Sequence, residues 1–125
     1  MIPAYGDKTA QVMGYILELE DGWYAVTNQA RKVGFALRFD EKLYPCIWYW
    51  QQLGDAAEGY PWWGRTHCAA LEPSTYWPGG GIARAVEDGT AVMLDPGQTI
   101  QTSLRATVYS GLDRVSSVSE DGEVR

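Results

Sequence analysis

The sequence predicts an all-β fold, an antiparallel β-sandwich, on three observations. Apolar and polar residues alternate over several short segments, turn residues separate these segments, and no segment has the pattern of a crossover helix. The chain has 125 residues, which is enough for one domain with its own core. We expect residues 1–112 to form this domain and residues 113–125 to be a frayed polar tail.

The first strands are predicted by period-two alternation and by one turn signal. Residues 13–19 alternate and end at Asp21-Gly22, a dipeptide typical of two-residue hairpins, so residues 23–27 are expected to return beside them. Residues 33–39 show the same alternation, with apolar side chains at the odd positions. This part of the chain therefore predicts two strands joined by a hairpin and a third strand after them.

The later strands include the one expected to be longest. Residues 47–50 are apolar on both faces, which is typical of a central strand. The sequence Asp-Pro-Gly at 95–97 predicts a turn, because proline fixes φ and glycine accepts the left-handed conformation. Residues 100–109 then form the clearest strand, with their even-numbered side chains expected inward. Two shorter candidates are residues 66–71 and 90–94.

Charge and composition exclude several classes of protein. Sixteen acidic and ten basic residues give a net charge of −6, whereas a nucleic-acid binder needs a basic face. No apolar run approaches the roughly 18 residues of a membrane helix, and no signal peptide is visible. Cys46 and Cys68 lack CxxC spacing, so we expect reduced thiols in a cytoplasmic protein. With His67 as the only histidine, we expect neither a metal centre nor a cofactor.

The aromatic residues indicate a site as well as a core. Six Trp and eight Tyr stand against two Phe, and many lie in irregular stretches at 54–64 and 73–81. Trp and Tyr join an apolar body to a polar group and so suit half-exposed surfaces. Long loops in compact domains are usually functional. For Trp48 core packing is the favoured interpretation, whereas Trp50, beside glutamines, fits core packing and sugar stacking equally well.

An ordered succession of motifs resembles the aldose 1-epimerase, or galactose mutarotase-like, superfamily. The motifs are GWYAVTN at 22–28, IWYWQ at 47–51, YPWWGR at 60–65, ALEP at 70–73 and LDPGQT at 94–99. The resemblance covers roughly residues 22–111 and is similar to the C-terminal half of the family's domain. It implies part of a β-supersandwich with a sugar-binding cleft, and interconversion of α and β anomers by acid/base proton transfer.

The resemblance also implies roles for individual residues. Glu72 matches the family's glutamate that takes the proton from the anomeric hydroxyl. The alternative is a strand-end carboxylate satisfied by backbone amides or by Arg65. The family's active-site histidines are expected to lie outside this chain. His67 is five positions from Glu72, so the two point to opposite faces unless a bulge intervenes. The candidate sugar-binding residues are Trp50, Gln52, Trp62, Trp63, His67 and Tyr76.

Three hypotheses about function and one about assembly follow. The first is a carbohydrate-binding protein of the aldose 1-epimerase type with Glu72 as base. The alternative is a non-catalytic sugar-binding half-domain, or a dimerising structural remnant without activity. Unpaired strand edges recruit other strands, so we expect a homodimer or association with a chain that carries the N-terminal half. Neither nucleic acid nor a membrane is an expected partner.

Overall fold

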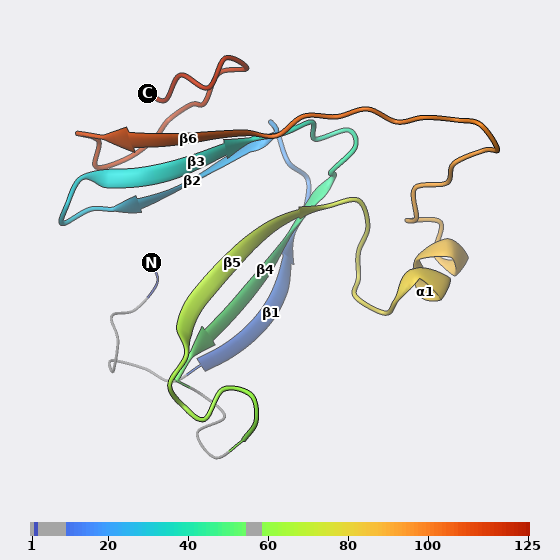
Figure 1. Cartoon of the computed structure of the whole chain (residues 1–125), viewed down its shortest axis with the longest axis horizontal. Helices are drawn as coiled ribbons and strands as arrows, with labels where there is room; N and C mark the ends of the chain where they lie inside the picture. Colours follow the sequence, from blue (N-terminus) through green and yellow to red (C-terminus); the bar gives the residue numbers. More distant parts are fainter. Residues whose placement is uncertain (1, 3–9, 55–58) are drawn as a thin grey trace. The chain divides into compact units, whose positions relative to one another are not determined.

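The computed structural model describes residue 2, residues 10–54 and residues 59–125 of the chain. The described residues form six strands in two antiparallel sheets and one short helix (Figure 1). The predicted all-β antiparallel class is therefore confirmed, with the strand content expected of a small β-sandwich. No helix among the described residues is long and apolar enough to cross a membrane.

The chain divides into two compact units, each with one sheet. The first unit comprises residues 1–18 and 45–91, and the second comprises residues 19–44 and 92–125. The sheets differ in strand order: β1-β4-β5 in the first unit and β2-β3-β6 in the second.

The sheet of the first unit has β4 (Cys46–Leu53) as its central strand. β1 (Ala10–Ile16) and β5 (His67–Ser74) pair with it antiparallel on either side. β4 is paired along both edges, and its ends are almost fully buried at Cys46, Ile47 and Leu53. The prediction that residues 47–50 belong to a central strand is confirmed. The helix α1 (Ile82–Glu87) follows β5 and buries Ala85.

The sheet of the second unit has β3 (Val33–Arg38) between β2 (Trp23–Asn28) and β6 (Arg105–Ser110). Its core has three buried residues with a ring of partly buried apolar side chains around them. The buried residues are Ala36, Tyr109 and Val118, and the surrounding ones are Trp23, Ala25, Leu112, Val115 and Val124.

A glycine on β3 makes room for the largest side chain of this core. Gly34 lies opposite Tyr109 in the β3–β6 register. A Cβ on Gly34 would overlap the Tyr109 ring, with Cε2 at 2.6 Å. The ring therefore lies across β3, and its hydroxyl is 2.5 Å from Thr27 Oγ1 and 3.3 Å from the Val26 carbonyl oxygen. An aromatic ring over a strand glycine covers exposed backbone and fixes the register.

The predicted hairpin at Asp21-Gly22 is wrong. The strand before it, β1, pairs with β4, whereas the strand after it, β2, pairs with β3. The glycine is needed for close approach instead, because a Cβ on Gly22 would overlap the Phe39 carbonyl oxygen. Phe39 N also donates to the Gly22 carbonyl oxygen at 2.7 Å. The dipeptide thus leads directly into β2, and its glycine lies beside the residue that follows β3.

The prediction of a long strand over residues 100–109 is also wrong. β6 begins only at Arg105, opposite Arg38, because the ladder ends where β3 ends. The longest described strands are β4 and β5, with eight residues each. The inward face is inverted as well, since Tyr109 is 9% exposed and Val108 is 83% exposed. The face that carries the Tyr109 ring is the buried one.

Two further predictions concern residues 90–97 and the C-terminal segment 113–125. Residues 90–94 form no strand, but the turn after them is confirmed, with Gln98 N donating to the Asp95 carbonyl oxygen at 2.9 Å and φ of 82° at Gly97. The segment expected to be a frayed tail is packed. Val118 is only 3% exposed and bridges to Val124.

Candidate functional site

One face of the β1-β4-β5 sheet carries several aromatic side chains and a carboxylate. In the register, Trp48 on β4 lies opposite Tyr15 on β1 and opposite Glu72 on β5. Because side chains alternate along a strand, Trp50 shares this face with Trp48. We call the surface of Tyr15, Trp48, Trp50 and Glu72 the aromatic face.

Trp48 is anchored at the centre of the aromatic face by its neighbours. Its ring meets Tyr15 edge-on with centroids 5.5 Å apart, and meets Tyr76 edge-on at 5.4 Å. Its Nε1 donates to the Tyr76 carbonyl oxygen at 2.7 Å. The Tyr15 hydroxyl accepts from Gly79 N at 2.7 Å. These bonds fasten the segment after β5 to the sheet and use the only polar group of the Trp48 indole.

The two tryptophans of the loop before β5 have different neighbours. Trp62 lies against Trp50, with ring centroids 5.1 Å apart and a tilt of 45°. Trp63 is 54% exposed and meets Tyr60 edge-on at 5.6 Å. Both backbone N–H groups of this pair donate to the Gly59 carbonyl oxygen, at 3.1 and 2.9 Å. Trp62 thus extends the aromatic face. Part of the predicted loop, residues 55–58, lies outside the described residues.

Glu72 presents an accessible carboxylate at this face. It is exposed on β5, which pairs with β4 on one side. Within the described part of the chain its side chain forms no ion pair, with Arg65 or with any other residue. A carboxylate in this position keeps its acceptor oxygens for hydroxyl groups of a ligand.

His67 and Gln52 are placed differently from Glu72. The β4–β5 ladder runs from Leu53–His67 to Cys46–Ser74 without interruption. The predicted opposite orientation of His67 and Glu72 is therefore confirmed, and no bulge brings them together. Gln52 has the parity of the aromatic face but is fully buried, so a ligand reaches it only if neighbouring side chains move.

The thiol of Cys46 is a structural donor at the edge of the aromatic face. Its Sγ lies 3.2 Å from the carbonyl oxygen of Ser74 and 3.3 Å from that of Tyr76, so its one proton is shared between the two acceptors. Burial raises the pKa of this thiol above its ordinary value. The protonated thiol is inert near neutral pH, because only the thiolate is a strong nucleophile. Cys46 and Cys68 are both free, as the sequence predicts.

Sequence reasoning left Tyr15 out of the candidate site. The alternation of residues 13–19 already placed it on one strand face, but the strand was paired with the wrong partner. Pairing of β1 with β4 brings Tyr15 against Trp48. The strand face on which Tyr15 lies was therefore predictable from the sequence, whereas the pairing of β1 with β4 was not.

Comparison with known proteins gives a family for the chain. No curated protein and no solved structure matches it significantly. Residues 6–108 match the family described as "Domain of unknown function (DUF4432)", and this range includes the whole of β1, β4 and β5 with Glu72 and the tryptophans around it. The chain therefore belongs to the DUF4432 family.

Proposed function

We propose that the chain binds a small sugar on the aromatic face and that Glu72 exchanges a proton with it, as in an aldose 1-epimerase. The observation that carries this proposal is the position of Glu72 directly across the strand pair from Trp48. Glu72 is an exposed carboxylate without an ion-pair partner among the residues that the structure describes. Indole rings stack on the C–H face of a sugar, while a carboxylate accepts its hydroxyl protons. The motif resemblance supports the same residue.

The chemistry needs a base and an acid. The Glu72 carboxylate takes the proton of the anomeric hydroxyl as the bond between the anomeric carbon and the ring oxygen breaks. The ring oxygen receives a proton from an acid, and the open aldehyde recloses on its other face with both transfers reversed. His67 is the only histidine of the chain and points away from Glu72. The acid in this proposal is therefore water or a group from an associated chain.

The missing acid favours a second candidate, which is sugar binding without catalysis. A second chain that completes the site has strand edges to pair with. The edge strands are β1 and β5 in the first sheet and β2 and β6 in the second. A homodimer is the simplest form of this partnership, because its contacts close on themselves. The free thiols fit a reducing, cytoplasmic location.

The test is a mutarotation assay on the full chain with α-D-glucose and α-D-galactose, followed by polarimetry. We expect a rate above buffer that Glu72→Gln lowers by about 100-fold or more. The control is Glu87→Gln, which removes an exposed carboxylate on α1 in the same unit and leaves the rate unchanged. An equal rate in Glu72→Gln contradicts the role of Glu72. Sugar-dependent Trp fluorescence without acceleration supports binding alone. The absence of both acceleration and a fluorescence change refutes the proposal.

A further inference from the structure

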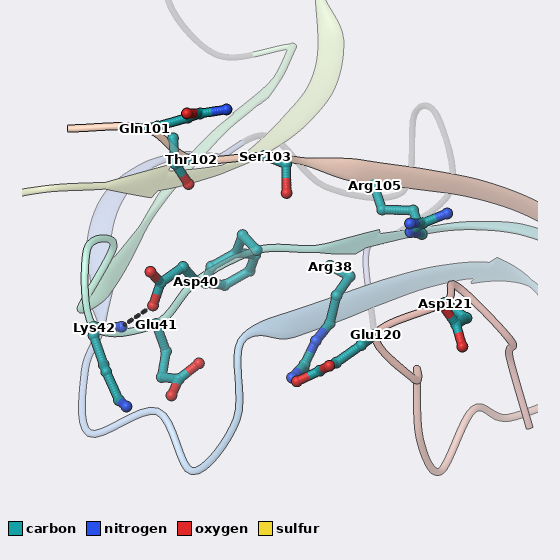
Figure 2. A pocket seen from close by; sticks show the side chains of 11 residues that line it. Arg38, Asp40, Glu41, Lys42, Gln101, Thr102, Ser103, Arg105, Glu120 and Asp121 are labelled. Atoms are coloured by element: carbon teal, nitrogen blue, oxygen red, sulfur yellow. Dashed lines mark hydrogen bonds between the residues drawn. The ribbon is translucent and has the colours of Figure 1, made fainter. Parts of the chain in front are cut away.

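The second unit contains a polar hollow that the proposed sugar site does not use (Figure 2). Its volume is about 580 Å³, within the range of small-molecule sites. Three segments form its wall: residues 38–42 at the end of β3, residues 101–105 leading into β6, and the turn at Glu120 and Asp121. Unlike most ligand pockets, this one is lined almost entirely by polar and charged side chains.

Three cationic residues, Arg38, Lys42 and Arg105, line the hollow. The Arg38 side chain is 17% exposed, and its guanidinium pairs with Asp21, which is not part of the lining. In the described part of the chain, Lys42 and Arg105 have no carboxylate within 4.0 Å. Two of the three cations therefore keep their hydrogen-bond donors for another group.

Four carboxylates face the same hollow, those of Asp40, Glu41, Glu120 and Asp121. None of them forms an ion pair with another described residue. Asp40 Oδ1 accepts from Lys42 N at 3.0 Å, which fixes the turn after β3 without neutralising the carboxylate. The hollow is thus lined by positive and negative side chains that form no ion pairs with one another.

The charge balance limits the chemistry of a ligand. Four carboxylates against three cations, one of them already paired, disfavour a phosphate or another simple anion. A simple amine satisfies the carboxylates but is repelled by Lys42 and Arg105. A molecule with both an ammonium and a carboxylate group pairs with each set, and charge-assisted hydrogen bonds are the strong ones. The hydroxyl groups of Thr102 and Ser103 add donors and acceptors of either kind.

We propose that this hollow is a binding site for a small zwitterion of amino-acid size. The site lies wholly within the second unit and is independent of the sugar site on the aromatic face. Its exposed charges are partly screened, so the affinity is weak, with a dissociation constant on the order of millimolar.

The experiment titrates glycine, 4-aminobutyrate and 6-aminohexanoate into the full chain at low salt, followed by ¹H–¹⁵N NMR. These probes separate the two charges by different lengths. n-Butylamine and butyrate carry one charge each and are the matched ligand controls. We expect at least one zwitterion to shift the amides of residues 40–42 and 101–103 saturably, about fivefold more tightly than either control. Absence of saturation by every zwitterion, or equal binding of butylamine or butyrate, overturns the proposal.

Variants locate the two charges of the ligand. Lys42→Gln and Glu41→Gln each remove one charge of the lining and are expected to weaken binding about fivefold. Arg31→Gln and Glu20→Gln are the matched controls, because both residues are exposed in the same unit and outside the lining. Binding that neither Lys42→Gln nor Glu41→Gln weakens relative to these controls also overturns the proposal.

Discussion

The close approach of Tyr109 to Gly34 predicts a strong effect of adding a single methyl group. In Gly34→Ala the new Cβ overlaps the Tyr109 ring, so the ring has to leave its place over β3. Its movement breaks the contact between the Tyr109 hydroxyl and Thr27 Oγ1, worth about 1 kcal/mol. Partial exposure of the buried ring costs about 2 kcal/mol more. Replacing a strand glycine returns about 1 kcal/mol, which leaves a net loss of about 2 kcal/mol.

The assay is urea unfolding followed by the intensities of the β3 amide resonances, which report on the second unit alone. The matched control is Gly14→Ala on β1, because a Cβ there has no atom within 4 Å. We expect this control to raise the unfolding free energy of the first unit by about 1 kcal/mol, because the gain from replacing a strand glycine is not offset by a clash.

A double-mutant cycle separates the clash from a general intolerance of substitution. In a Tyr109→Leu background the ring is absent, so Gly34→Ala should cost at least about 1 kcal/mol less than in the parent chain. An equal cost in both backgrounds, or a Gly34→Ala variant no more destabilised than Gly14→Ala, would refute the reasoning.

Three other predictions concern thiols and the C-terminal segment. Iodoacetamide should modify Cys46 at least about tenfold more slowly than Cys68, as read by mass spectrometry, because the Cys46 thiol is buried and protonated; equal rates would contradict this. Burial raises the pKa of Cys46 above 9.0, so its contribution to stability is complete below that pH and is lost as pH rises through the higher folded-state value. Unfolding free energies should therefore fall more steeply above pH 9.0 in the parent chain than in Cys46→Ala, and parallel curves would argue against it. Val118→Ala should cost about 2 kcal/mol in urea unfolding, since Val118 is 3% exposed, whereas a frayed tail would show no cost.

Alternation along the strands correctly predicted which of the candidate residues share a face of the sheet. Trp48 and Trp50 share a face, and His67 and Glu72 do not, because side chains on an uninterrupted strand alternate whatever its neighbours are. The central position of β4 was also predictable, since residues apolar on both faces need cover on both. These features depend on local sequence alone.

The buried face of the second sheet was not predictable from residue type. Alternation on β6 pointed to Val108 as the inward residue, yet Tyr109 is buried and Val108 is exposed. The decisive fact is the space over Gly34, which depends on the register of another strand far away in the sequence. The pairing of β1 with β4 escaped prediction for the same reason, because a turn dipeptide is local and strand pairing is not.

The outer parts of the candidate site come from irregular segments, which have no period to interpret. Tyr76 reaches Trp48, and Trp62 reaches Trp50, through loops whose paths follow from individual hydrogen bonds. Composition indicated that these loops matter, but it did not distinguish Trp62 from Trp63. Only the contact with Trp50 makes that distinction.

Sugar binding on the aromatic face is tested most directly by the indole N–H resonances of the full chain during a titration with D-galactose and D-glucose. We expect saturable shifts of Trp50 and Trp62, no shift of Trp23 in the second unit, and about fivefold weaker binding in Glu72→Gln. Unmoved Trp50 and Trp62 resonances at high millimolar sugar, or shifts that Glu72→Gln leaves unchanged, would contradict this expectation.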